Sequence, residues 1–474
     1  MQDRSTPPRS VGDPGSFRDP GSFRDPATQV FVDRGRVLRA LDPRALDDFR
    51  ALAGSALFKD GIARGELIGT KETLEAPPPG EWAGVLEHER IPVISYPYEW
   101  TFSMLRDAAL LQLTLFDAAL NEDLTMKDAT PYNVQFRGAC PTFIDIGSFR
   151  RLTPGEPWLG YRQFCMQFLY PLMLRAYKDV PFQPWMRGRL EGISASDIRE
   201  LMSPRDLLRK GVLLHVALQA RAERRLADSE RDIREELRAA GFRTEMIQAN
   251  LARLRKIVTA MHWHPKGAWK RYASGYEHVE QDRPSKSAFV EAVLTELSPR
   301  TVWDLGTNDG HFARLAAGHA DFVVAMDMDE PVIDQLYQAL HADGERKILP
   351  LVVDLTDSSP GLGWEGTERN RLEQRGRPEL VLSLALIHHL VITKGIPLPR
   401  IVSWLASLNA AVVLEYVDRD DPLVLRLAHN RLQHEIHRYD EAFLRGELQR
   451  HFRVEREMRL PSGHRTLFLL RPQR

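Results

Sequence analysis

The feature that most constrains the fold is residues 301–317, a short apolar segment that runs into a tight glycine-containing turn. Its letters are TVWDL, then GTNDG, then HFARLAA, in which apolar side chains recur at helical spacing. Glycine at 306 and 310 permits backbone geometry and close ligand approach that a Cβ would obstruct. The pattern predicts a buried strand, a turn and a helix. Such a turn lies at the carboxyl edge of an open α/β sheet, where ligands bind.

Four further apolar segments follow, and two amphipathic segments lie between them. The apolar segments are residues 322–327, 348–354, 379–389 and 411–416, and the amphipathic ones are 332–342 and 398–408. This alternation predicts a parallel, doubly wound sheet. The first two apolar segments end in acids, Asp327 and Asp354. An acid about twenty residues after the turn can accept hydrogen bonds from both hydroxyls of a ribose.

These ordered motifs resemble those of class I S-adenosylmethionine-dependent methyltransferases. The resemblance covers residues 261–474 and rests on DLGTNDG (304–310), Asp327, Asp354 and LALIHH (384–389). It implies a Rossmann-like, seven-stranded sheet with an antiparallel final hairpin and S-adenosylmethionine as the cofactor. The usual pattern has a small residue or cysteine where Thr307 stands. The alternative is a Rossmann-like domain that binds another nucleotide, or none.

The resemblance also implies which side chains contact the cofactor. The turn lies against the methionine part, Asp327 binds the ribose and Asp354 binds the adenine amine. A tyrosine ahead of the first strand attracts the cationic sulfonium, or else packs a cap helix on the domain. The residues expected to bind the cofactor are Asp304, Gly306, Asn308, Gly310, Asp327, Asp354, Leu355, Tyr272 and Lys286.

Candidate catalytic residues follow the fourth and fifth strands. His388 and His389 stand at the mouth of the expected pocket, where a histidine takes a proton from an attacking hydroxyl or amine, or only shapes the pocket. A metal site there is disfavoured, because adjacent histidines point in different directions. Glu415 opens an acidic loop on the same edge, which is either a substrate contact or a solvated loop.

Composition bounds the rest of the chain. The 474 residues predict two or more domains, and the net charge of −1 gives no global attraction to nucleic acid or to an anionic membrane. Cys140 and Cys165 are the two cysteines, which argues against a disulfide scaffold and fits a reducing cytosol. We expect no membrane span, since no apolar run is long enough. The expected location is cytoplasmic.

The front of the chain divides into three expected parts. Residues 1–26 contain two copies of DPGSFR, at 13–18 and 19–24, and are expected to form a disordered tail. A hairpin is expected around Asp33-Arg-Gly35, and a long helix over 103–119. The domain boundaries are 27–202 for a first domain, 203–260 for a helical connector and 261–474 for the methyltransferase-like domain.

A second set of motifs resembles the catalytic loops of protein kinases and aminoglycoside phosphotransferases. Asp128 and Asn133 have the Asp-x-x-x-x-Asn spacing, and Asp145-Ile-Gly147 stands where those enzymes bind Mg²⁺. The resemblance implies an α+β kinase-like domain, with Asn133 and Asp145 as Mg²⁺ ligands and ATP as a second cofactor if it is active. No glycine-rich phosphate loop is recognisable, and Lys59 and Lys71 are the candidates for the phosphate-binding lysine. The alternative is an ordinary turn whose polar side chains form hydrogen bonds with their own backbone.

The sequence therefore predicts a methyltransferase of unidentified acceptor with a kinase-like domain for substrate recognition or regulation. The order of the two halves resembles a set of bacterial class I methyltransferases, some of which carry nodulation-protein names. Two alternatives stay open. One is a bifunctional kinase and methyltransferase, and the other is a non-catalytic protein that binds the cofactor.

Overall fold

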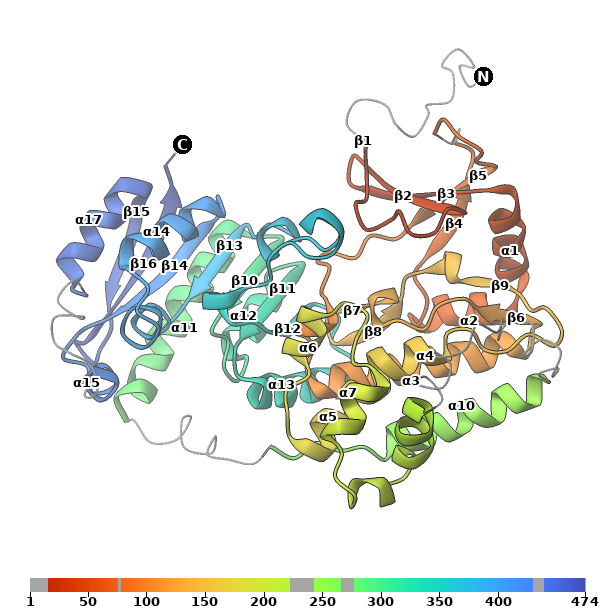
Figure 1. Ribbon diagram of the computed structural model, residues 1–474. Coiled ribbons are helices and arrows are strands. Elements are labelled where there is room, and N and C mark those ends of the chain that lie inside the picture. The colour runs from red at the N-terminus through yellow and green to blue at the C-terminus, as the bar shows by residue number, and fades with distance from the viewer. Residues whose placement is uncertain (1–15, 76–77, 222–242, 266–276, 429–438, 474) are drawn as a thin grey trace, which may run out of the picture.

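The computed structural model describes residues 16–75, 78–221, 243–265, 277–428 and 439–473. Two sheets divide it into a front half and a back half, with a group of helices beside the front sheet (Figure 1). Tyr272, which was expected to cover the cofactor, lies outside the described residues. No helix in the described ranges is long and apolar enough to cross a membrane.

The back half is built on a seven-stranded sheet. Its strands are β10 (Thr301–Leu305), β11 (Phe322–Asp327), β12 (Ile348–Val352), β13 (Leu380–Ser383), β14 (Ala411–Val417), β15 (Phe452–Arg459) and β16 (Arg465–Pro472). They lie in the order β12-β11-β10-β13-β14-β16-β15. The first five are parallel, and β16 pairs antiparallel with both β14 and β15. This confirms the methyltransferase-like sheet and its final antiparallel hairpin.

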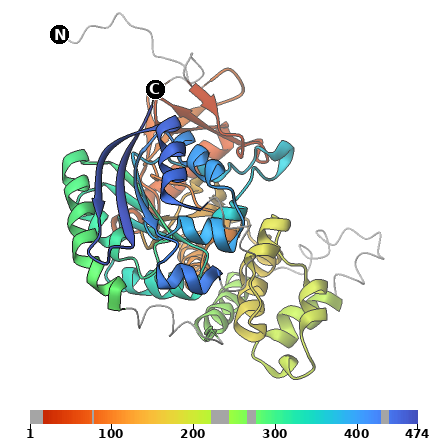
Figure 2. The ribbon, with the colours of Figure 1, turned by 90° about the vertical axis from the view of Figure 1, so that its left-hand side faces the viewer.

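Helices cover both faces of this sheet (Figure 2), as a doubly wound fold requires. The helices are α11 (Glu277–Leu297), α12 (His311–Ala317), α13 (Glu330–Ala342), α14 (Leu398–Ser407), α15 (Pro422–Ala428) and α17 (Glu441–His451). Central strands are buried on both faces, which explains their continuous apolar letters. The short helical turns are η8 (Leu355–Asp357), η9 (Trp364–Gly366), η10 (Leu372–Gln374) and η11 (His389–Thr393).

The front half contains a five-stranded antiparallel sheet and two short strand pairs. The sheet strands, in the order β1-β2-β3-β5-β4, are β1 (Ser16–Arg18), β2 (Thr28–Asp33), β3 (Arg36–Leu41), β5 (Gly84–His88) and β4 (Thr70–Thr73). The pairs are β6 (Leu124–Met126) with β9 (Phe149–Arg151) and β7 (Val134–Arg137) with β8 (Cys140–Phe143). The hairpin expected around Asp33-Arg-Gly35 is confirmed as β2–β3.

The expected disordered tail is wrong from residue 16 onward. β1 pairs with β2, and the second DPGSFR copy forms the turn between them. The Asp19 carboxylate accepts a hydrogen bond from the Gly21 amide at 2.8 Å, and the Ser22 hydroxyl accepts one from the Val30 amide at 2.8 Å. Residues 1–15 lie outside the described residues.

Helices of the front half surround one buried helix, α3. The helices are α1 (Pro43–Gly54), α2 (Ala56–Arg64), α3 (Phe102–Leu120), α4 (Tyr161–Phe164), α5 (Tyr170–Lys178), α6 (Gln183–Gly188), α7 (Ala195–Leu201) and α10 (Thr244–Thr259). Shorter helical elements are η1 (Pro97–Glu99), η2 (Pro131–Asn133), η3 (Ile146–Ser148), η4 (Cys165–Leu169), η5 (Asp206–Leu208) and η6 (Leu213–Leu218). Thr101 caps α3 by accepting from the Met104 amide at 3.2 Å. α3 confirms the helix expected over 103–119, and α10 packs against it.

Candidate functional site at the carboxyl edge of the back sheet

The turn after β10 is held against the end of β11 by its backbone. The amides of Gly306 and Thr307 both donate to the Met326 carbonyl, at 2.8 and 3.0 Å. Gly310 has a φ of +78°, and a Cβ there would lie 2.6 Å from a methyl carbon of Leu336. The turn therefore needs glycine at 310 for conformation and for space.

Asp304, in β10, is hydrogen-bonded to this turn. It is buried, and its carboxylate accepts a 2.6 Å hydrogen bond from the Thr307 hydroxyl. Burial raises its pKa to about 7, although the Thr307 hydrogen bond acts in the opposite direction. Thr307, which departs from the usual family pattern, supplies the donor that this carboxylate needs. Asp304 thus holds the turn in place, and its burial distinguishes it from a residue that meets a ligand directly.

Asp327, at the end of β11, lies directly beside the turn. Its carboxylate accepts hydrogen bonds from the amides of Asn308 and Asp329, each at 3.1 Å. Asn308 adopts a φ of +49°, so the turn bends toward this acid. Burial raises the pKa of Asp327, and its backbone hydrogen bonds oppose that shift. A carboxylate has further lone pairs after accepting two hydrogen bonds, so Asp327 remains able to bind a diol.

Asp354 follows the neighbouring strand, β12. The Val353 amide donates to the Asp327 carbonyl at 2.8 Å, which places the two expected acids on adjacent strand ends. One Asp354 oxygen accepts from the Thr356 amide and hydroxyl at 2.9 and 2.7 Å, and the other accepts from Lys394 at 3.0 Å. Partial burial disfavours the charge, but these hydrogen bonds outweigh it and lower the pKa of Asp354. Leu355 is partly buried against the core.

The two histidines follow β13, and their rings contact each other at a centroid distance of 4.3 Å. His388 is 1% exposed, and its Nδ1 is buried without a hydrogen-bond partner among the described residues. Burial lowers its pKa well below the usual value, and the charges of Arg465 and Lys286 act in the same direction. His388 is therefore neutral at pH 7.

Glu415 is enclosed by cations and does not face an open pocket. It is fully buried, with one oxygen 2.6 Å from Lys286 Nζ and the other 3.2 Å from an Arg465 nitrogen. Arg465 also binds Asp421 at 3.0 Å. The hypothesis that Glu415 is catalytic conflicts with this position, because both its oxygens are already engaged. Lys286, expected at the cofactor, is likewise buried and paired with Glu415.

In the front half, three residues expected to form a kinase-like loop come together. The Asn133 amide nitrogen lies 3.3 Å from one Asp145 oxygen, and Arg39 of β3 lies 2.8 Å from the other. Burial raises the pKa of Asp128, and the nearby Asp145 charge adds to that effect. The sequence analysis did not identify Arg39 as a member of this cluster. Lys71, one of the two lysines considered for phosphate binding, lies 3.1 Å from Glu87 on the sheet surface.

The environment of Asp145 does not suit the expected Mg²⁺. The Arg39 guanidinium holds one carboxylate oxygen, and a bound cation would be repelled by that charge. Across the described ranges, no three or more histidine, cysteine, aspartate or glutamate side chains are grouped as a metal site. Asn133 and Asp145 therefore do not fit a Mg²⁺ site.

A bridging segment, residues 357–376, ties the carboxyl edge of the back sheet to the front half. It begins three residues after Asp354 and ends before β13. Its contacts with the front half join Asp357 to Arg187 (2.9 Å), Ser359 to Tyr98 (3.2 Å), Glu368 to Arg24 (2.8 Å), Asn370 to Tyr96 (2.9 Å) and Arg375 to Glu99 (2.5 Å). The loop that carries the expected adenine acid is thus anchored by the front half.

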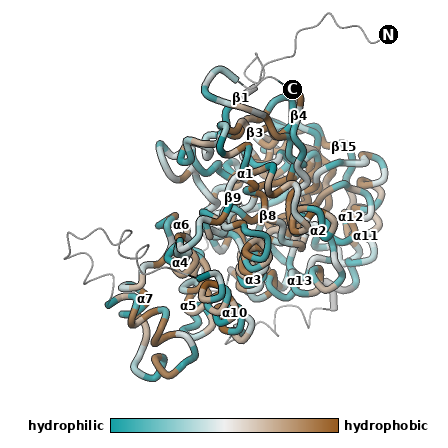
Figure 3. Tube along the Cα trace, turned by 90° about the vertical axis from the view of Figure 1, so that its right-hand side faces the viewer, coloured by the Kyte–Doolittle hydropathy of each residue, from teal (hydrophilic) through white to brown (hydrophobic). Residues whose placement is uncertain are grey.

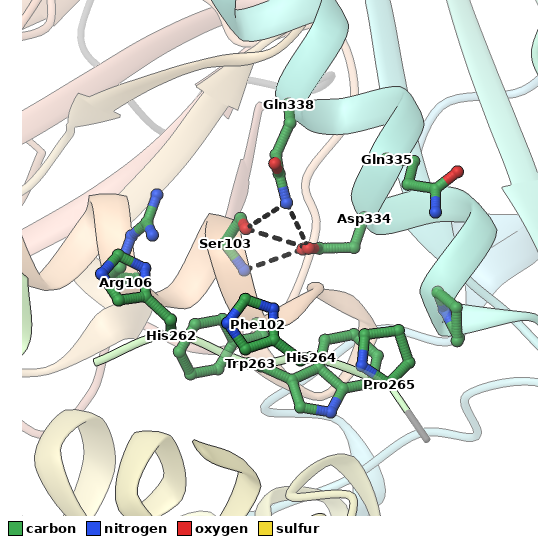
Figure 4. Close-up of a pocket in the computed structure, with 11 residues that line it drawn as sticks. Phe102, Ser103, Arg106, His262, Trp263, His264, Pro265, Asp334, Gln335 and Gln338 are labelled. Carbon is green, nitrogen blue, oxygen red and sulfur yellow. Dashed lines mark hydrogen bonds between the residues drawn. The ribbon is translucent and has the colours of Figure 1, made fainter. Parts of the chain in front are cut away.

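A cavity of about 270 Å³ lies at a second junction between the halves, where α3, residues 261–265 and α13 meet (Figure 4). The Asp334 carboxylate in its wall accepts from the Ser103 amide and hydroxyl, at 2.9 and 3.0 Å, and from Gln338 at 2.7 Å. None of the described residues expected to bind the cofactor lines this cavity. Asp334 therefore serves to join the halves.

Solved structures with similar folds align with under half of the chain. N-methyltransferase NodS from Bradyrhizobium japonicum WM9 is 12% identical, with 41% of this chain and 97% of that chain covered and a TM-score of 0.30. Magnesium protoporphyrin IX methyltransferase from Synechocystis PCC 6803 with bound SAH is 19% identical, covering 43% and 92%, with a TM-score of 0.31. WbdD, crystallised with the kinase inhibitor LY294002, is 19% identical, covering 44% and 43%, with a TM-score of 0.30.

No family model matches the chain, but the sequence of one known protein is similar to it over nearly its whole length. The chain is 32% identical over 447 residues to the nodulation protein NoeA of Rhizobium meliloti (strain 1021), and the match covers 93% of each chain. The similarity thus spans the front sheet, the helices and the back sheet alike. The chain belongs to the NoeA family of nodulation proteins.

Proposed function

We propose that the chain is an S-adenosylmethionine-dependent methyltransferase whose site lies at the carboxyl edge of the back sheet. The observation that carries the proposal is the placement of Asp327 and Asp354 on adjacent strand ends beside the turn. Acceptor carboxylates at these two places suit the hydroxyls of a ribose and the amine of an adenine. Gly310 lets the turn pack closely on Leu336, which keeps the turn beside these acids.

S-adenosylmethionine, when bound, supplies an electrophilic methyl group. The residues of this chain contribute binding, orientation and exclusion of water. Asp327 accepts hydrogen bonds from the ribose, Asp354 accepts one from the adenine, and Asp304 keeps the turn in shape. These contacts fix the cofactor along the ends of β10, β11 and β12.

His388 orients the methyl acceptor in this proposal. Its unpartnered Nδ1 is a hydrogen-bond acceptor for an attacking hydroxyl or amine. The buried positive charges of Lys286 and Arg465 disfavour a further positive charge on the His388 ring, so an imidazolium is unfavourable there. His388 therefore positions the acceptor more readily than it carries its proton as a strong base. Many methyl transfers need no strong base.

For the front half we propose a kinase-like fold that recognises the substrate or regulates the enzyme. The element order supports this: a five-stranded sheet with α1 and α2 between β3 and β4, then α3, then two strand pairs around Asp128, Asn133 and Asp145. The pairing of Arg39 with Asp145 argues against phosphoryl transfer, because Arg39 occupies the carboxylate that binds the metal in active kinases. The bridging segment offers the physical connection through which this half influences the site.

The test uses S-adenosylmethionine with a labelled methyl group. The protein is incubated with a cell lysate fractionated into protein, RNA, lipid and glycan, and small molecules. Label is expected in one fraction, and its transfer is expected to fall strongly in Asp327→Asn. Asp343→Asn, at an exposed helix end, is the matched control and retains activity. Cofactor binding without label transfer to any fraction would favour a non-catalytic binding protein.

A further inference from the structure

Five leucines form the densest group of exposed apolar side chains in the structure. Among the described residues, fourteen large hydrophobic side chains are exposed, and five of them fall within residues 201–218. We call these five the leucine patch: Leu201 (38% exposed), Leu208 (89%), Leu213 (55%), Leu214 (40%) and Leu218 (50%). Single exposed leucines are ordinary on protein surfaces, whereas a contiguous group marks an interaction site.

The three elements that carry the patch, α7, η5 and η6, are neighbours in space. Both α7 and η5 contact η6. Within η6, a π-helix, Leu213 and Leu218 are five residues apart and lie on one face, with Leu214 beside them. These helices lie at the edge of the molecule, away from both sheets, and carry hydrophobic stretches there (Figure 3).

The opposite face of η6 is already buried, so the exposed leucines do not belong to the core. Val212 and Val216 are 0% exposed, and His215 is 1% exposed. The Tyr161 hydroxyl contacts a His215 ring nitrogen at 2.7 Å, and the Tyr170 hydroxyl donates to the His215 carbonyl at 2.5 Å. A helix that is apolar on both faces is characteristic of one covered on both. Within the part of the chain that the structure describes, η6 is covered on the side of Val212, His215 and Val216 and exposes its leucines on the other side.

Basic side chains accompany the leucine patch. Residues 199–221 contain five arginines and lysines and two acids, a net charge of +3 in a chain whose total is −1. Arg205, Lys210 and Arg221 are exposed. One of the two acids, Asp206, is buried and already bound by Lys178 at 3.0 Å and Arg209 at 3.2 Å. The other acid, Glu200, is exposed beside Leu201, so these three exposed cations and one exposed acid accompany the leucines. The surface thus presents leucines together with an excess of positive charge.

Leucines flanked by cations match the two layers of a bilayer surface, which are acyl chains beneath anionic headgroups. A second copy of the chain is a poorer match. A twofold contact through the leucine patch would bring like charges of the two copies together. We propose that the leucine patch docks the protein on an anionic lipid bilayer, with the leucines inserted at the headgroup boundary and Arg205, Lys210 and Arg221 facing the headgroups. The proposal is independent of the methyltransferase assignment.

The test is vesicle flotation of the full chain. Vesicles of phosphatidylcholine with phosphatidylglycerol are compared with vesicles of phosphatidylcholine alone. Wild-type protein is expected to float with the anionic vesicles and much less with the neutral ones. Arg205→Gln and Lys210→Gln are each expected to weaken binding roughly fivefold. Leu208→Asp and Leu213→Asp are each expected to weaken it roughly tenfold or more.

Leu74→Asp is the matched control, because Leu74 is a fully exposed leucine on the front half, outside the patch. It is expected to float like wild type, and circular dichroism verifies that all variants are folded. The proposal is overturned if wild-type protein does not bind, or if the patch variants bind as well as wild type does. It is also overturned if wild type is a dimer that Leu208→Asp dissociates, since a second copy would then be the occupant.

Discussion

The carboxylate of Glu99 and the guanidinium of Arg375 form a two-pronged ion pair buried between the halves of the protein. The two nitrogen–oxygen distances are 2.5 and 2.8 Å, and each residue is at most 4% exposed. The same guanidinium donates to the Ile94 carbonyl at 2.7 Å and lies over the Tyr96 ring. A pair this well bonded offsets the cost of burying its charges only while both partners are present.

Arg375→Met is therefore expected to destabilise the protein by about 3–5 kcal/mol, because it leaves the Glu99 charge buried and unpaired. Chemical denaturation measures the loss. Arg300→Met breaks the Arg300–Glu379 pair, in which the side chains are 78% and 41% exposed, and is expected to cost at most about 1 kcal/mol. A second change, Glu99→Leu in the Arg375→Met background, is expected to recover part of the stability. Equal losses for Arg375→Met and Arg300→Met would contradict a structural role for the buried pair.

Asp327→Asn tests the cofactor site without removing its shape. The amide keeps an acceptor oxygen but loses the charge, and hydrogen bonds to charged groups contribute about 1.5–3 kcal/mol. S-adenosylhomocysteine affinity, measured by calorimetry, is expected to fall by roughly tenfold to a hundredfold. Asp343→Asn removes a carboxylate from the far end of α13 and is expected to leave the affinity unchanged. Unaltered affinity in Asp327→Asn would place the ribose elsewhere.

Asp304 gives the protein a distinctive pH dependence. Burial raises its pKa to about 7, above the usual value of 3.8, so the folded state binds a proton that the unfolded state has released. Its contribution to stability is fully present below about pH 4 and is lost as the pH rises through about 7. In Asp304→Asn this loss disappears. Urea unfolding at about pH 5 and about pH 8 is therefore expected to show a smaller difference for the variant than for wild type, whereas a variant with an unchanged difference would refute the assignment.

What could be predicted from the sequence was local. The turn at residues 306–310 and the acids Asp327 and Asp354 lie within short segments whose letters reveal strand, turn and helix. Even Thr307, noted only as a departure from the family pattern, stands three residues from the Asp304 carboxylate it bonds. A hydroxyl at that spacing is a signal that the acid turns inward.

What escaped prediction depends on distant partners. Glu415 looks like an available acid, but its partners Lys286 and Arg465 lie 129 and 50 residues away in sequence. The second DPGSFR copy looks disordered, yet Arg24 in it binds Glu368, which is 344 residues away. The first set of contacts forms when α11, β14 and β16 pack within the back half, and the second when the two halves pack. Composition gives no indication of either.

The last prediction separates two roles for His388. If it positions the acceptor through Nδ1, His388→Gln retains an acceptor oxygen and is expected to keep most of kcat, while His388→Phe loses roughly tenfold or more. If it were the base, both changes would abolish turnover alike. The assay follows label transfer to the fraction that accepts methyl groups. Because the pKa of His388 lies well below its usual value of 6.5, its titration is expected to leave no inflection in kcat at or above that value. An inflection near pH 7 that vanishes in His388→Gln would instead identify it as the base.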